Sequence, residues 1–227
     1  MPNFMVNINT TRNAYRELPD DQRIAAARST VKLLITMRGA EPPIDSTIVP
    51  DFLASDAVVA RYFEIEPPIA AVMPEFQEII DEIEYTYVAG LHFAAVSASC
   101  VTIERLLNLA RIELHPFQVK IKELWGKGPS NSWYENIDAL RSWGYIDATF
   151  ATELRELYDD VRNRYLHCGD IRNLAADSLR AVRAAYRLLQ ILLGFPGDLF
   201  QIAEGRMRCA NENDPRYKAF YAKHVVD

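Results

Sequence analysis

The clearest pattern of hydrophobic and polar positions in this chain runs from Pro74 to about Leu114. The stretch contains no further proline and one glycine, Gly90. Apolar side chains recur in it at intervals of three and four residues, which predicts an amphipathic helix. At about 1.5 Å per residue an unbroken helix would be about 60 Å long, so we expect a bend at Gly90. The stripe consists of Phe76, Ile79, Ile80, Ile83, Tyr87, Leu91, Ala94, Ala98 and Val101.

Shorter helical patterns follow this stretch. His115-Pro116 ends the long pattern, and a short helix is expected over 117–125. Asn131 or Ser132 can then accept hydrogen bonds from the free N–H groups of a first turn. The helix that they begin should run through Trp143 and stop at Gly144, because glycine readily adopts the backbone conformation that ends a helix.

Two more helices are expected towards the C-terminus. Asp147 or Thr149 begins the first, and Gly169 ends or kinks it; the second spans 174–193, and a third, short helix is possible over 198–206. The first buries Leu154, Leu157, Tyr158, Val161, Tyr165 and Cys168, and the second buries Leu179, Val182, Tyr186, Leu189 and Leu193.

The N-terminal part has a weaker pattern. Residues 1–18 are polar and aperiodic, as in an arm, and a helix is predicted from Asp20 to about Arg38. The segment from Pro50 to Phe63 fits either a short helix or a strand. We therefore divide the chain into an N-terminal extension, 1–70, and a helical domain, 71–227. The fold class predicted is all-α, an antiparallel helical bundle with an N-terminal extension.

Composition narrows the possible surroundings and partners. The net charge is -6 and the sequence pI is about 5.3, whereas a protein that coats nucleic acid is normally basic. Contact with RNA would therefore need a local patch. The N-terminus lacks the features of a signal peptide, and the apolar stretch over 88–101 is too short and too polar to cross a membrane. Three widely spaced cysteines fit a reducing cytoplasm. We predict a cytoplasmic protein that does not contact a membrane.

Candidate chemistry concentrates in the segment 158–170. It holds Arg162 and His167 five residues apart, with Asn163 directly after the arginine. Arg162 carries a permanent planar charge that suits phosphate, and the proton of His167 moves near neutral pH. On a helical wheel His167 shares a face with Asn163, whereas Arg162 lies about 140° away and flanks the buried stripe. The two can converge on one substrate through a kink near Gly169 or across an interface between two copies.

This pattern resembles the R-[polar]-x-x-x-H signature of the HEPN superfamily (higher eukaryotes and prokaryotes nucleotide-binding domains), and the resemblance covers roughly residues 73–195. Supporting similarity lies in the order of the preceding segments, which are Tyr87-x-x-Gly90, Ile103-Glu104-Arg105-Leu106-Leu107 and Ile137-x-x-Leu140-x-x-x-Gly144-Tyr145-Ile146. The resemblance implies a helical bundle that dimerises, with the motifs meeting in an interface cleft. For active members it implies metal-independent endoribonuclease activity, often within toxin–antitoxin or antiviral systems.

The residue types suit that reaction. In RNA cleavage the 2′-oxygen attacks the neighbouring phosphate and leaves a 2′,3′-cyclic phosphate. His167 can take or supply the proton, Arg162 can hold the phosphate in two hydrogen bonds, and Asn163 can position the phosphate or His167. Arg164 and Arg172 are candidates for contacts with the RNA backbone. We expect neither a metal nor a cofactor, because His92, His115 and His224 lack ligand spacing and the loop 126–130 is not a Walker loop.

Each of these residues also has an ordinary structural interpretation. Arg162 near Asp159 forms a surface pair in that interpretation, and His167 favours the end of a helix dipole. Glu104 fits a solvated or interhelical salt-bridge residue better than a partner that orients Arg162. HEPN toxins paired with a nucleotidyltransferase carry a tyrosine where this chain has Gly169, so modification of such a tyrosine is not supported.

Two hypotheses therefore stand. One is a dimeric ribonuclease that has an antitoxin or another defence-system protein as partner. The other is a non-catalytic helical interaction module that acts as a regulator or scaffold.

Overall fold

The computed structural model describes residues 5–7, 15–37, 55–68, 70–72, 74–114, 132–166, 171–194, 200–203, 206–215 and 218. Helices make up most of these residues, so the predicted all-α class is confirmed, and the strands form two small two-stranded sheets. The helices are α2 (Asp20–Met37), α3 (Asp56–Glu64), α4 (Pro74–Val88), α5 (His92–Glu113), α7 (Trp133–Ser142), α8 (Ala148–Leu157), the π-helical segment η3 (Tyr158–Arg162), α9 (Asn163–Leu166) and α10 (Leu174–Leu193). The strands are β1 (Met5–Asn7), β2 (Ala70–Val72), β3 (Phe200–Ala203) and β4 (Arg206–Cys209).

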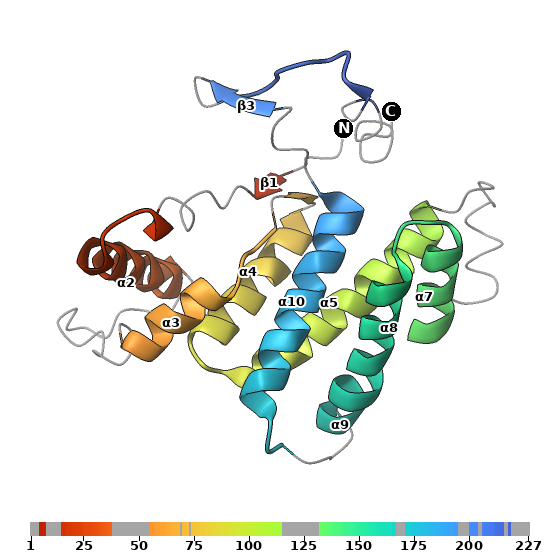
Figure 1. The fold of residues 1–227 in the computed structure, drawn as a ribbon, viewed down its shortest axis with the longest axis horizontal. Helices are drawn as coiled ribbons and strands as arrows, with labels where there is room; N and C mark the ends of the chain where they lie inside the picture. The colour runs from red at the N-terminus through yellow and green to blue at the C-terminus, as the bar shows by residue number, and fades with distance from the viewer. Residues whose placement is uncertain are drawn as a thin grey trace.

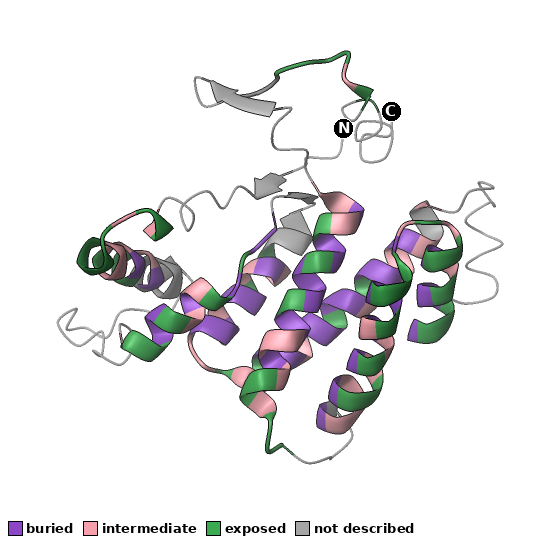
Figure 2. Ribbon diagram, viewed as in Figure 1, coloured by how far each residue is buried: buried purple, intermediate pink, exposed green. Residues whose placement is uncertain are grey.

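Helices α5 and α10 form the centre of the molecule. They pack against each other, α4 lies beside α5, and α7 and α8 cover another side of α5 and α10 (Figure 1). The buried hydrophobic residues of these helices belong to one core, and Figure 2 shows the buried faces of the helices turned towards one another. Helix α3 joins the same core through Val58, Val59 and Tyr62.

The predicted caps of α7 and α8 are confirmed. The Ser132 hydroxyl accepts a hydrogen bond from the N–H of Glu135, and the Asp147 carboxylate accepts one from the N–H of Phe150 at 2.7 Å. Gly144 follows α7 with φ at +79°, a left-handed conformation that costs glycine little. The bounds of α10 also agree with the range predicted from the hydrophobic pattern.

The long pattern from Pro74 is divided at the position where a bend was expected. Gly90 has φ at +81° and lies between α4 and α5. The side chain of Arg61 packs against it, and a Cβ added to Gly90 would lie 3.1 Å from the Arg61 Nη2 atom. The Arg61 Nε atom donates to the Val88 carbonyl at 2.9 Å, so this arginine supplies a hydrogen-bond donor for a backbone carbonyl at the C-terminal end of α4.

Two predictions require correction, and one open alternative is decided. The possible helix over 198–206 is wrong, because β3 and β4 form an antiparallel pair there, with Phe200 opposite Cys209. The arm over 1–18 is not wholly irregular, because β1 pairs antiparallel with β2. The segment near Tyr62, for which helix and strand were both open, is the helix α3. The short helix expected over 117–125 lies outside the described residues.

Helix α5 is the most apolar long helix. Its segment His92–Arg111 is long and apolar enough to cross a membrane by length and composition alone, and half of that segment is buried inside the protein. The sequence pattern drew attention only to 88–101, which is shorter and starts before the break at Gly90. A central helix of a packed core passes the same test of length and composition, so this feature does not by itself assign α5 to a membrane.

Candidate functional site

The candidate motif lies on a helix whose hydrogen-bond pattern changes immediately before it. Helix α8 continues into the π-helical segment η3, where the N–H of Asn163 donates to the carbonyl of Tyr158 five residues earlier. An ordinary α-helix joins residues four apart. The wider turn changes the direction in which Arg162 leaves the helix, so a wheel drawn at 100° per residue does not place it correctly. Single π turns within helices are frequent at functional sites.

Arg162 is held between two helices and an aromatic ring. Its Nη2 atom donates to the Glu104 carboxylate of α5 at 3.2 Å, and its side chain keeps 21% of its surface exposed. Its Nη1 atom donates to the Asn163 side-chain oxygen over a long 3.4 Å. The guanidinium lies over the Tyr158 ring, 5.1 Å from the ring centre. Glu104 thus forms an interhelical ion pair, but its partner is Arg162 itself, so the pair fits both the salt-bridge interpretation and a role in orienting Arg162. The alternative pair of Arg162 with Asp159 is not formed, and Asp159 contacts Tyr134 instead.

Glu104 is itself fixed by a buried tryptophan. The Trp133 indole N–H donates to the same Oε2 atom at 3.3 Å, and Trp133 is 1% exposed. One carboxylate oxygen therefore accepts from α7 and from η3 together. Cys100 lies close to this group, and burial raises the pKa of its thiol to about 12 despite the nearby Arg162 charge. It is therefore a neutral packing residue and not a nucleophile.

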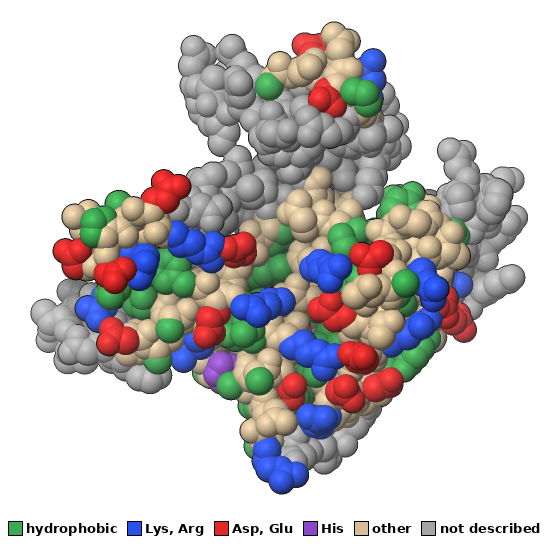
Figure 3. All heavy atoms as spheres, in the orientation of Figure 1, with side chains coloured by type: hydrophobic (Ala, Val, Ile, Leu, Met, Phe, Trp, Pro, Cys, Tyr) green, Lys and Arg blue, Asp and Glu red, His purple; other side chains and the backbone are tan. Residues whose placement is uncertain are grey.

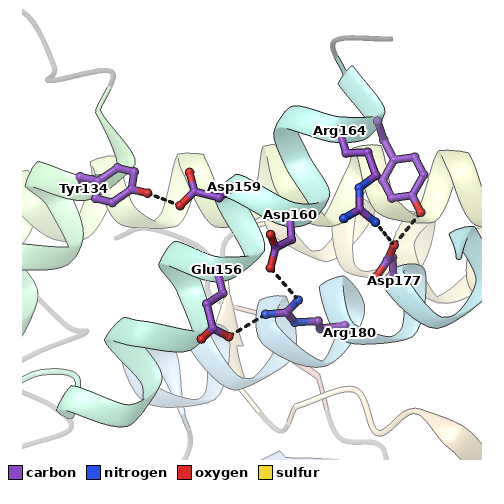
Figure 4. A network of polar contacts seen from close by, with 8 residues as sticks. Tyr134, Glu156, Asp159, Asp160, Arg164, Asp177 and Arg180 are labelled. Atoms are coloured by element: carbon purple, nitrogen blue, oxygen red, sulfur yellow. Dashed lines mark hydrogen bonds and ion pairs between the residues drawn. The ribbon is translucent and has the colours of Figure 1, made fainter. Parts of the chain in front are cut away.

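Polar contacts tie the outer face of the motif helix to its neighbours (Figure 4). On α7, the Tyr134 hydroxyl donates to Asp159, which explains why Asp159 does not pair with Arg162. On α10, Arg180 contacts Glu156 at 3.0 Å and Asp160 at 3.8 Å. These pairs hold η3 in place at two points along its length.

A further contact joins α9 to the first turns of α10. The Asp177 carboxylate accepts from the Tyr165 hydroxyl at 2.6 Å and from Arg164 at 3.3 Å. Burial, followed by the hydrogen bond to Asp177, raises the pKa of Tyr165 to about 12. Arg164, which the sequence suggested for RNA contact, is thus engaged within the protein.

The structure brings together only part of the predicted site. Asn163 lies beside Arg162, half-buried, and Arg172 is exposed at the start of α10 with a partner within the protein. His167, the predicted proton carrier, lies outside the described residues. Sequence reasoning missed Trp133 and Asp177 as neighbours of the motif, because their contacts join different helices; the stacking of Tyr158 under Arg162 joins two residues of one helix, and the sequence analysis assigned Tyr158 only to the buried stripe.

An apolar strip on α5 lies exposed near the Glu104–Arg162 pair. Phe93 and Val101 are 51% and 50% exposed, and Ala94 between them is also exposed. Ser97 shares this side of the helix, and its hydroxyl donates to the Phe93 carbonyl. A partner that covers Ser97 would therefore leave this hydroxyl hydrogen-bonded. Residues 93, 97 and 101 are four apart and lie on one side of a helix. We call Phe93, Ala94, Ser97 and Val101 the α5 strip.

Over the described residues, the face of the molecule shown in Figure 3 has no extended basic surface. Arginines and carboxylates alternate over α8 and α10, and ion pairs between them account for much of this alternation, including Arg187 with Glu153 at 2.9 Å. Among the described residues, no group of three or more His, Cys, Asp or Glu side chains could hold a metal ion.

Comparisons of this chain with protein-family models, with curated proteins and with solved structures find no match. The resemblance to the HEPN superfamily therefore depends on the motif and on the order of its neighbouring segments.

Proposed function

We propose that this protein is a metal-independent endoribonuclease of HEPN type that acts as a homodimer. The observation that carries the proposal is the state of Arg162. Its side chain is partly exposed and pairs with the Glu104 carboxylate of another helix, and Glu104 follows Val101 of the exposed α5 strip by three residues. An arginine has five N–H donors, and two of them are used here, so donors remain for a phosphate.

The chemistry assigns one role to each motif residue. Arg162 holds the scissile phosphate and stabilises the charge that develops on its oxygens. His167 moves the proton of the attacking 2′-oxygen or of the leaving 5′-oxygen, and Asn163 positions the phosphate. The products are a 2′,3′-cyclic phosphate and a 5′-hydroxyl. Within this proposal the helices form a HEPN-like antiparallel bundle, and the activity belongs to a cytoplasmic toxin–antitoxin or antiviral system.

The alternative is a non-catalytic interaction module. Two observations favour it: the net charge is -6, and Asp159, Asp160 and Glu156 are exposed on the motif helix, where they would repel RNA. Because Arg162 already pairs with Glu104, it also has a structural explanation without any substrate.

The first test compares cleavage of single-stranded RNAs of mixed sequence by the wild type, Arg162→Ala and His167→Ala. Loss of the proton carrier should slow cleavage by about 100- to 10,000-fold, and loss of the phosphate clamp by about 100- to 1,000-fold. Arg187→Ala is the control, because Arg187 makes ion pairs of similar kind with Glu153 and Asp147 away from the motif. Equal residual cleavage in all four proteins would exclude the nuclease and favour the interaction module.

The second test concerns the metal. If His167 moves the proton, no divalent ion is needed to activate a nucleophile, so cleavage should survive EDTA. Activity that disappears with EDTA and returns with manganese would contradict the proposal.

A further inference from the structure

We propose that Glu104 is a positioning residue, which sets the orientation of the Arg162 guanidinium towards the scissile phosphate. This inference rests on the proposed function, because it assigns to Glu104 a part in the same reaction. Glu104 belongs to α5 and lies 58 residues before Arg162 in the chain. It does not touch the substrate in this proposal and acts only through Arg162.

The geometry of the contact favours a Glu104 that positions the Arg162 guanidinium over one that only neutralises its charge. Glu104 engages Arg162 through the single atom Nη2, at 3.2 Å. A bidentate pair would use two parallel N–H groups and would occupy the edge that a phosphate needs. The observed contact uses one donor and leaves the rest of the fork open, apart from the long contact with Asn163.

The carboxylate is also well fixed. The Trp133 N–H donates to the Oε2 atom that receives Arg162, and the Trp133 ring is buried in the core. The Tyr158 ring under the guanidinium restricts its remaining rotation. Three elements, α5, α7 and η3, therefore determine the position of one side chain. Such support matters because a displacement of about 1 Å of a catalytic group can reduce the rate about 100-fold.

The test uses Glu104→Gln, which keeps the size of the side chain. Its amide still offers one oxygen but can no longer attract Arg162 by charge. We expect kcat for RNA cleavage to fall by up to about 100-fold, with a smaller change in KM. Glu135→Gln is the matched control, because Glu135 forms a similar α5–α7 ion pair with Arg111 at 3.4 Å. The control should retain the wild-type kcat.

A second variant separates positioning from stability. In an Arg162→Ala background, Glu104→Gln should reduce kcat no further, since Glu104 acts only through Arg162. A merely structural residue would still reduce it. Trp133→Phe removes the N–H donor and should give a smaller fall in kcat than Glu104→Gln.

A measurement without catalysis completes the test. Nitrogen NMR of labelled arginine should show slow rotation about the Arg162 Cζ–Nη bonds in the wild type and faster rotation in Glu104→Gln. Unchanged rotation, or cleavage as fast in Glu104→Gln as in the wild type, would overturn the role of Glu104. If the wild type cleaves no RNA, the proposed nuclease fails, and the NMR result still decides whether Glu104 orients Arg162.

Discussion

At the scale of single residues, the Arg162–Glu104 ion pair should contribute little to the stability of the fold and much to the proposed reaction rate. The two side chains keep 21% and 30% of their surface exposed, and pairs near the surface contribute at most about 1 kcal/mol to stability. A 100-fold change in rate corresponds to about 2.7 kcal/mol in the barrier. Substitutions at either position should therefore leave the protein folded while the rate, if the proposal holds, changes strongly.

His92 shows how local contacts determine a tautomer. Ser178 Oγ lies 2.7 Å from the Ala175 carbonyl and 2.8 Å from His92 Nδ1. Both contacts are hydrogen bonds when the hydroxyl donates to the carbonyl and accepts from His92 Nδ1–H. The Nε2 atom of His92 is then the acceptor of a neutral ring. Burial, followed by the positive charge of Arg61, lowers the pKa of His92, and both causes disfavour the protonated ring.

The lowered pKa of His92 predicts that acid weakens the fold. Between its folded pKa and the unfolded value of about 6.5, the unfolded chain binds a proton that the folded protein does not. Above about pH 6.5 His92 therefore does not lower the free energy of unfolding. As the pH falls below this value, the free energy of unfolding decreases by at most about 1.4 kcal/mol per pH unit. Urea unfolding between pH 7.5 and 5 should show a smaller loss for His92→Gln than for the wild type. Parallel curves would contradict this assignment.

At the scale of elements, the sequence predicts what local chemistry determines. The caps Ser132 and Asp147, the stop at Gly144 and the bounds of α10 were predicted because each depends on a few neighbouring residues. Strand β3 falls inside the segment 198–206 that was predicted as a possible short helix, since a few residues of mixed character carry no clear period and only the pairing with β4 defines the strand.

The π-helical segment η3 could not be predicted in the same way. Nothing in the local sequence announces that the Asn163 N–H will reach the Tyr158 carbonyl. We attribute the wider turn to the contacts that hold it, Glu104 with Arg162 on one side and Arg180 with Asp160 on the other. The sequence thus identified the motif, whereas the orientation of Arg162 came only from the packing of three helices.

Two of the described glycines, Gly90 and Gly144, have positive φ and allow a matched prediction about element ends. Replacing either by alanine places a side chain in the left-handed region, at about 1–2 kcal/mol. Gly144 has no atom within 4 Å of the added Cβ, whereas at Gly90 the Arg61 guanidinium lies at 3.1 Å. Gly90→Ala should therefore destabilise the protein more than Gly144→Ala, as measured by urea unfolding. In an Arg61→Ala background, Gly90→Ala and Gly144→Ala should lower the free energy of unfolding equally. Equal losses at the two glycines would show that Arg61 moves aside without cost.

At the scale of the whole molecule, the core extends beyond the predicted domain. Val58, Val59 and Tyr62 of α3 share one hydrophobic cluster with α4, α5 and α10, and Arg183 of α10 donates to the carbonyl of Glu64 at 3.0 Å. The boundary at residue 70 stays a prediction. The hydrophobic pattern locates the helices, but it does not tell which of them meet, because contacts between distant segments leave no trace in a single sequence.

The last prediction concerns the assembly of two copies. The core helix of a monomeric protein normally buries its apolar residues within the protein, yet Phe93 and Val101 on α5 remain about half exposed. Ala94 and Ser97 between them are small enough to let another helix approach closely. The Glu104 carboxylate follows Val101 by three residues on the same helix, so a second copy seated on the α5 strip would lie next to the Arg162 of the first. A symmetric dimer through this strip would bring the two candidate sites towards one axis.

Light scattering and sedimentation at micromolar concentration should thus show a dimer for the wild type. Val101→Glu and Phe93→Glu each place a charge where the partner is expected, and burying an unpaired charge is costly, so both variants should be monomeric and folded. Thr152→Glu is the control, because Thr152 is exposed on α8, away from both the α5 strip and the motif, and should leave the dimer intact. If cleavage needs both copies, RNA cleavage should fall together with dimerisation in the two α5 variants and recover at high protein concentration. A wild type that is monomeric yet cleaves RNA would show that Arg162 acts within one chain, and the kink near Gly169 would then be the remaining way for His167 to reach the phosphate.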